Sequence, residues 1–137
     1  MRWVADSSIA LAFVLPDEHS GAAQRFFASS GQMEALWAPA LWHYEIANVL
    51  ALAMKKGRID SSQFDAALEV IGAMPWRFHA AGEVCHVRKI AATATRFGLT
   101  AYDAAYLDLA IDMQCGLATL DNALKLAAKK ARVKVFA

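Results

Sequence analysis

Residues 99–110, with the sequence LTAYDAAYLDLA, predict a helix that places an acidic side chain beside a buried apolar face. Apolar side chains recur there every three or four positions, which is the spacing of one helix face; the set is Tyr102, Ala105, Tyr106, Leu109, Ala110 and Met113. At about 100° per residue, Asp103 falls on the flank of this face, whereas Asp108 and Asp112 are expected to face solvent. Because Thr100 and Asp103 also match the T-x-x-D pattern of a helix N-cap, this stretch alone leaves open whether Asp103 is structural or functional.

Short apolar runs alternate with longer helical patterns along the rest of the chain. The runs predict buried strands, and they lie at residues 3–5, 36–38, 76–79, 117–119 and 133–136. The helical patterns are bounded by Pro39, Pro75 and Gly98, and they cover residues 9–15, 22–28, 41–56, 59–74, 83–97 and the stretch after Thr100. Such alternation predicts an α/β fold with a mainly parallel central sheet of four to five short strands and helices on both faces.

The composition is that of one globular domain. With 137 residues, of which 58% are hydrophobic, the chain is expected to form a single domain over residues 1–137. A formal net charge of +1 predicts neither a nucleic-acid nor an acidic partner. Cys85 and Cys115 are far apart in the sequence and are expected to be reduced core residues. No apolar run reaches the ~18 residues of a membrane span, so the cytoplasm is the expected location.

Two further acids are predicted to lie at the carboxyl ends of strands. Asp6 directly follows the run at residues 3–5, and the serines after it are expected to cap the next helix. Asp121 follows the run at residues 117–119 and precedes a helical pattern, so an N-cap is its structural alternative. The crevice of an open parallel sheet lies outside the carboxyl ends of its strands, where both acids would emerge.

A fourth acid, Glu45, has unusual surroundings for a carboxylate. It is expected near the middle of an apolar side of the helix at residues 41–56, with Asn48 one turn later as a polar neighbour; the apolar set is Leu41, Trp42, Val49, Leu52 and Ala53. A buried charge must be paired, hydrogen-bonded or bound to a cation, and the neighbouring positions offer no obvious basic partner. Four carboxylates at one rim repel one another unless a cation lies among them, and an all-oxygen set favours Mg²⁺ or Mn²⁺.

Four pieces of the chain, spread over almost its whole length, carry a family resemblance. They are residues 4–8 (VADSS), Pro39 with residues 44–50 (YEIANVL), residues 99–107 (LTAYDAAYL) and residues 118–121 (ATLD). In this order they resemble the PIN-domain ribonucleases, and within them the VapC-type toxins of toxin–antitoxin pairs. The resemblance implies a PIN-like three-layer α/β/α sandwich. It also implies a metal-dependent endoribonuclease that hydrolyses RNA phosphodiester bonds as the toxin of a type II toxin–antitoxin system.

The resemblance further implies the site residues and the partners. Mg²⁺ would be the cofactor, with Mn²⁺ able to substitute, and the catalytic, metal-binding acids would be Asp6, Glu45, Asp103 and Asp121. Supporting polar roles would belong to Ser8, Asn48 and Thr119. A homodimer and a cognate antitoxin are implied, and we expect the antitoxin to place an arginine among the acids. Its docking surface is expected at residues 10–15 and 50–54, where apolar residues exceed what one core face requires.

Alternative functions remain open at this stage. A PIN nuclease acting in RNA processing or on DNA would share the same metal and phosphate chemistry. A phosphoacceptor receiver domain also has clustered acids on a parallel sheet, but it needs an acidic pair at the end of the first strand, where Asp6 is followed by Ser7 and Ser8. A non-catalytic binding module would leave the position of Glu45 unexplained.

Overall fold

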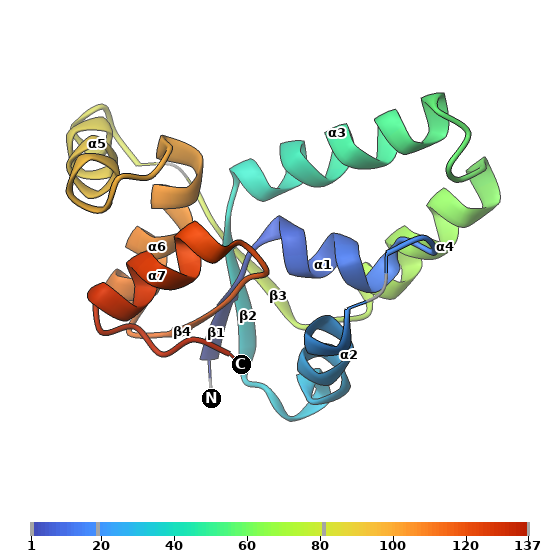
Figure 1. The fold of residues 1–137 in the computed structure, drawn as a ribbon, viewed down its shortest axis with the longest axis horizontal. Helices are drawn as coiled ribbons and strands as arrows, with labels where there is room; N and C mark the ends of the chain where they lie inside the picture. Colours follow the sequence, from blue (N-terminus) through green and yellow to red (C-terminus); the bar gives the residue numbers. More distant parts are fainter. Residues whose placement is uncertain (1, 19, 81, 137) are drawn as a thin grey trace.

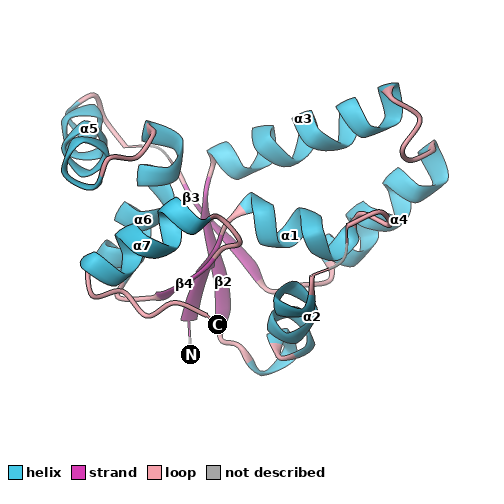
Figure 2. Ribbon diagram, in the orientation of Figure 1, coloured by secondary structure: helices cyan, strands magenta, loops and turns pink. Residues whose placement is uncertain are grey.

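The computed structural model describes residues 2–18, 20–80 and 82–136, in which short strands alternate with helices (Figure 2). The elements in chain order are β1 (Arg2–Ala5), α1 (Ser7–Val14), α2 (Gly21–Ala28), the 3-10 helix η1 (Ser30–Gln32), β2 (Ala35–Pro39), α3 (Leu41–Lys55), α4 (Ser61–Gly72), β3 (Trp76–His79), α5 (Cys85–Phe97), α6 (Ala101–Met113), β4 (Gly116–Ala118) and α7 (Asn122–Lys130). None of the helices within these described ranges combines the length and apolar character needed to cross a lipid bilayer.

The four strands form one parallel sheet in the order β3-β2-β1-β4. Val4 in the central strand β1 pairs with Trp37 of β2 on one side and with Leu117 of β4 on the other. Figure 1 shows α1–α4 on one side of the sheet and α5–α7 on the other. The predicted three-layer α/β/α sandwich is therefore confirmed, and the parallel strands direct all their carboxyl ends toward one edge.

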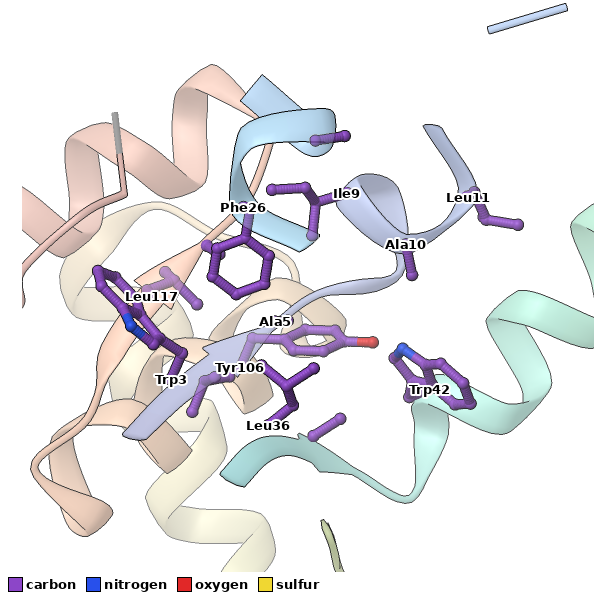
Figure 3. Packing of buried hydrophobic residues seen from close by; sticks show 14 of the residues in the cluster. Trp3, Ala5, Ile9, Ala10, Leu11, Phe26, Leu36, Trp42, Tyr106 and Leu117 are labelled. Atoms are coloured by element: carbon purple, nitrogen blue, oxygen red, sulfur yellow. The ribbon is translucent and has the colours of Figure 1, made fainter. Parts of the chain in front are cut away.

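The core lies on both faces of β1, because the apolar run at its centre is covered by helices on each side. Trp3 packs edge-to-face on Phe26, with ring centroids 5.9 Å apart (Figure 3). It also packs edge-to-face on Phe136, with ring centroids 5.6 Å apart. Gly116 lies opposite Trp3 in the register, and a Cβ there would come within 2.5 Å of the Trp3 ring. Glycine thus lets β4 approach β1 closely, which brings the end of β4 beside the end of β1.

The predicted fifth strand at residues 133–136 is wrong as a regular strand. Val135 forms only an isolated parallel bridge to Leu117. Two backbone hydrogen bonds flank it, from the Leu117 amide to Lys134 and from the Phe136 amide to Leu117. The alternating pattern was sufficient to predict an extended segment beside β4, but not a ladder.

Two expectations about exposure are also wrong. Cys85 is exposed at the start of α5, whereas Cys115 is buried as predicted. The expected apolar docking surface at residues 10–15 is mostly interior, because α2, α3 and α4 pack around α1 and bury Leu11 and Leu15. At residues 50–54 the same holds for Leu50 and Ala53, while Leu52 remains exposed.

Candidate active site

Asp6 lies at the carboxyl end of β1 and is 4% exposed. Its amide donates to the Ala118 carbonyl, which extends the β1–β4 pairing by one residue. Its carboxylate accepts a hydrogen bond from the Ile9 amide, so Asp6 itself is the N-cap of α1. The serine cap expected from the sequence is wrong, because the helix begins at Ser7, two residues earlier than the apolar pattern indicated.

Two hydroxyl groups complete the surroundings of the Asp6 carboxylate. The Ser8 hydroxyl donates to Oδ1 at 2.7 Å, and the Thr119 hydroxyl donates to Oδ2. Ser8 and Thr119 in turn accept hydrogen bonds from the amides of Leu120 and Asp121. Both residues predicted to support the site on this side therefore lie in one network that fixes the orientation of Asp6.

Burial raises the pKa of Asp6 to about 6. The hydrogen bonds from Thr119, Ser8 and Ile9 stabilise the ionised carboxylate and lower the pKa, but they only partly offset the desolvation. The nearby charge of Asp103 raises it further. A carboxylate with these surroundings is one that a bound cation would stabilise in its ionised form.

Asp103 lies in the first turn of α6 and is partly buried. The Thr100 hydroxyl accepts a hydrogen bond from the Asp103 amide at 3.1 Å, which confirms the predicted N-cap. The Asp103 carboxylate itself accepts no hydrogen bond within the described residues, so the cap does not account for the acidic side chain. Desolvation raises its pKa, and the charge of Asp121 adds to that effect.

Asp121 caps α7, as the structural alternative predicted. Its Oδ1 accepts a hydrogen bond from the Ala123 amide at 3.2 Å. The second oxygen of this partly buried side chain remains available. The negative charge of Asp121 also raises the pKa of Asp103. A capping role and a role in the site are therefore compatible for this residue.

Glu45 lies on the second turn of α3 and is partly buried. The buried side chains of this helix are Trp42, Ile46, Leu50 and Ala53. Glu45 is therefore at the edge of the buried stripe, and the expectation that it lies in the middle of an apolar face is wrong, because Leu52 is exposed rather than buried. Its Oε1 accepts a hydrogen bond from the Tyr106 hydroxyl of α6 at 2.5 Å.

Asn48 does not join the hydrogen bonds around the candidate acids. It is exposed on α3, and within the described residues its side chain makes no hydrogen bond to the four acids.

The four acids lack basic partners. None of them forms an ion pair with a lysine, arginine or histidine in the described ranges, where the ion pairs belong to other carboxylates. The same residues also contain no group of three or more Asp, Glu, His or Cys side chains close enough to hold a metal ion. The acids therefore interact in pairs, Asp6 with Asp103 and Asp103 with Asp121.

A second set of charges lies on α6, away from these acids. Asp108 is 5% exposed, so the prediction that it faces solvent is wrong. It accepts a hydrogen bond from Thr93 at 3.1 Å and pairs with Lys89 at 3.4 Å, both on α5. Because α5 covers this side of α6, the helix is buried on two sides. Tyr102 was expected on the buried face of α6, but it is 67% exposed.

A family model described as "PIN domain" matches residues 4–130. The chain belongs to the PIN-domain family. This PIN domain is 34% identical over 128 residues to the ribonuclease VapC3 of Pyrobaculum aerophilum, and the match covers 90% of this chain and 92% of that protein. The receiver-domain alternative is no longer supported.

Two solved structures resemble this PIN domain. PAE2754 from Pyrobaculum aerophilum has a TM-score of 0.73 and 21% sequence identity, and the match covers 98% of this chain and 83% of that one. FitAcB from Neisseria gonorrhoeae has a TM-score of 0.66 and 18% identity, with coverage of 100% and 97%. At these identities the likeness supports the fold that the sequence predicts.

Sequence reasoning assigned Tyr106 to the core and missed its contact with a candidate acid. Tyr106 follows Asp103 by three positions, which places both side chains on the same side of α6. It is fully buried, yet its hydroxyl reaches Glu45. A buried tyrosine one turn after a candidate catalytic acid was the available signal, because a buried hydroxyl requires a partner.

Proposed function

We propose that this PIN domain is a metal-dependent endoribonuclease that hydrolyses RNA phosphodiester bonds at Asp6, Glu45, Asp103 and Asp121. One observation carries the proposal. Acidic residues from different elements lie near one edge of the sheet, and two of them are partly or fully desolvated with no basic counterion in the described residues. The name of the homologous ribonuclease VapC3 supports RNA as the substrate.

The donor set suits Mg²⁺, with Mn²⁺ as a substitute. Mg²⁺ accepts hard oxygen ligands, keeps several waters and is commonly held by one or two carboxylates together with substrate phosphates. A closed cage of three protein ligands is therefore not required, and the pairwise arrangement of Asp6 and Asp103 fits such an ion. When bound, Mg²⁺ would polarise the phosphodiester and lower the pKa of a water molecule.

The side chains of this protein would divide the work by their surroundings. Asp6 is held rigidly by Ser8 and Thr119, so it would define where the cation binds. Asp103, whose carboxylate is not used by the helix cap, and Asp121, with one oxygen available, would complete the acidic edge. Glu45, with one oxygen bound by Tyr106 and the other available, would contribute to the cation site from α3, and the exposed Asn48 would contact the approaching RNA strand.

Cleavage assays with purified protein test this proposal. Structured RNA, single-stranded RNA and single-stranded DNA are compared side by side with Mg²⁺, with Mn²⁺ and with excess chelator. We expect cleavage of RNA that requires metal and is lost in Asp103→Asn. Cleavage of DNA alone would favour the DNA-directed alternative, and equal activity of Asp103→Asn or in chelator would contradict the proposed site.

We further propose that the enzyme acts in the cytoplasm as a homodimeric toxin of a type II toxin–antitoxin system. The similarity to VapC3 over nearly the whole chain supports this role. The cognate antitoxin would insert an arginine among the acids, because the planar guanidinium pairs with carboxylates in a bidentate manner. Such an arginine would compete with the metal and exclude the substrate.

Expression with and without the neighbouring open reading frame tests the toxin role. Growth arrest without the neighbour, relief by Asp103→Asn and co-purification with the neighbour are the expected results. Light scattering of the purified protein measures its oligomeric state. Harmless expression of an active wild-type ribonuclease would instead favour a PIN nuclease of RNA processing.

A further inference from the structure

Tyr106 is a large, fully buried side chain, 1% exposed, yet it ends in a hydroxyl group. It lies on α6 and packs with the core residues of β1 and β2 (Figure 3). A phenylalanine would fill nearly the same space without a polar atom to satisfy. The hydroxyl is therefore not explained by packing alone.

The Tyr106 hydroxyl connects the two helices that carry Asp103 and Glu45. It donates a hydrogen bond to Glu45 Oε1 at 2.5 Å, while its own backbone lies one turn after Asp103. Desolvation, the hydrogen bond to Glu45 and the charges of Glu45 and Asp6 raise the pKa of the phenol more than an interaction with Ser7 lowers it, so it stays protonated and remains a donor.

A second buried polar group lies on α3 but makes no hydrogen bond to the Tyr106 hydroxyl. The Trp42 indole nitrogen is buried and has no hydrogen-bond partner within the described residues. Figure 3 shows it directed toward the end of the Tyr106 side chain. The indole therefore does not share the Tyr106 hydroxyl, whose hydrogen bond goes to Glu45.

We propose that Tyr106 is a positioning residue that fixes the Glu45 carboxylate of α3 relative to Asp103 of α6, and thereby sets the affinity of the acidic site for a divalent cation. The inference rests on the proposed function. One Glu45 oxygen is bound by Tyr106 and the other remains available, so the hydrogen bond favours orientations in which Oε1 faces α6. Partners that orient a metal-binding carboxylate typically change metal affinity about 10- to 100-fold when they are removed.

The test is Mn²⁺ binding to the full chain, measured by titration calorimetry without RNA. Tyr106→Phe removes only the hydroxyl, and we expect its dissociation constant for Mn²⁺ to rise about tenfold. Tyr44→Phe and Tyr102→Phe are matched controls. Each removes one hydroxyl next to a candidate acid, but Tyr44 is 79% and Tyr102 is 67% exposed, and we expect wild-type binding from both.

A double-mutant cycle distinguishes positioning from a general effect on structure. If Tyr106 acts through Glu45, then Tyr106→Phe causes no further loss of Mn²⁺ affinity once Glu45→Gln is present. Additive losses would mean that Tyr106 stabilises the site by packing, and would overturn the inference. Wild-type affinity of Tyr106→Phe would overturn it as well.

A measurement on the wild type covers the case in which Tyr106→Phe does not fold, as judged by circular dichroism. The resonance of the Tyr106 hydroxyl proton is then followed by NMR while Mg²⁺ is added. We expect this resonance to shift, and an unchanged resonance would contradict the inference. Failure of the proposed function would give a different result from failure of this inference. In that case the wild type would not bind Mn²⁺, or Asp103→Asn would bind Mn²⁺ as tightly as the wild type.

Discussion

The charge of Asp103 raises the pKa of Asp6, although Asp6 caps α1 and Asp103 lies in the first turn of α6, far along the sequence. Neither acid has a basic counterion within the described residues, so the repulsion between them is relieved only by protonation or by a cation. The metal-free protein is therefore expected to carry a destabilising pair of charges at neutral pH.

Asp6→Asn is expected to stabilise the metal-free protein at pH 7.5 and to abolish RNA cleavage. The pKa of Asp6 is raised from 3.8 to about 6, so ionised Asp6 costs about 3 kcal/mol above pH 6. Asparagine retains a capping side chain without the charge. Urea unfolding is expected to give a gain of about 1–3 kcal/mol at pH 7.5 and almost none at pH 3.5, where the wild-type carboxyl is protonated in the folded state and mostly protonated in the unfolded state.

The exposed Asp65 of α4 provides the control for this comparison, and Asp65→Asn is expected to change the free energy of unfolding by less than about 0.5 kcal/mol. A clear loss of stability in Asp6→Asn at pH 7.5 would mean that the carboxylate serves mainly as a helix cap.

The affinity for Mn²⁺ is expected to fall as the pH decreases below 6. Asp6 has a raised pKa, so below about 6 the metal must displace a proton, and the dissociation constant is expected to rise about tenfold for each pH unit. Calorimetric titrations at pH 7, 6 and 5 measure this slope. An affinity that does not vary with pH would exclude Asp6 from the ligands.

Thr119→Val is expected to move the acidic limb of that pH profile to higher pH. The Thr119 hydroxyl donates to Asp6 and stabilises its ionised form, so its removal raises the pKa of Asp6 further. The midpoint of Mn²⁺ binding against pH reports the change. Thr95→Val, an exposed substitution on α5, is the control and is expected to leave the midpoint in place.

Lys89→Met is expected to loosen α5 without affecting metal binding. Lys89 pairs with Asp108 and Asp112, and its loss leaves the buried Asp108 with only the Thr93 hydroxyl as a partner in the described structure. We expect a cost of about 1–2 kcal/mol and faster amide exchange confined to α5. Arg88→Met, on the same helix and exposed, is expected to be nearly neutral; an equal effect of both substitutions would contradict the role of the Lys89 pair.

The positions of Asp6, Asp103 and Asp121 could be predicted because each depends on local rules. A carboxylate after a short apolar run or within a T-x-x-D cap is placed by its own strand or helix turn. The surroundings of Asp108 could not be predicted in this way. The spacing on α6 describes one buried face, but the second face is buried by α5, and no periodicity within α6 contains that information.

The surroundings of Glu45 also could not be predicted from the spacing on its own helix. Its apolar neighbours on α3 suggested a buried charge in need of a cation, yet Leu52 proved exposed and the carboxylate lies at the edge of the buried stripe. Its hydrogen-bond partner, Tyr106, belongs to a helix far along the sequence. Contacts between distant elements decide how a polar side chain is satisfied, and a single sequence does not state them.

The bond between Thr119 and Asp6 also has a consequence for the time at which the protein becomes active during its own synthesis. Asp6 is synthesised 113 residues before Thr119, which directly follows β4, the strand that pairs with β1. A nascent chain therefore contains Asp6 and Ser8 long before Thr119 is made. In a domain assembled in this order, the Asp6 carboxylate lacks part of its hydrogen-bond network until the ribosome has made the chain as far as Thr119.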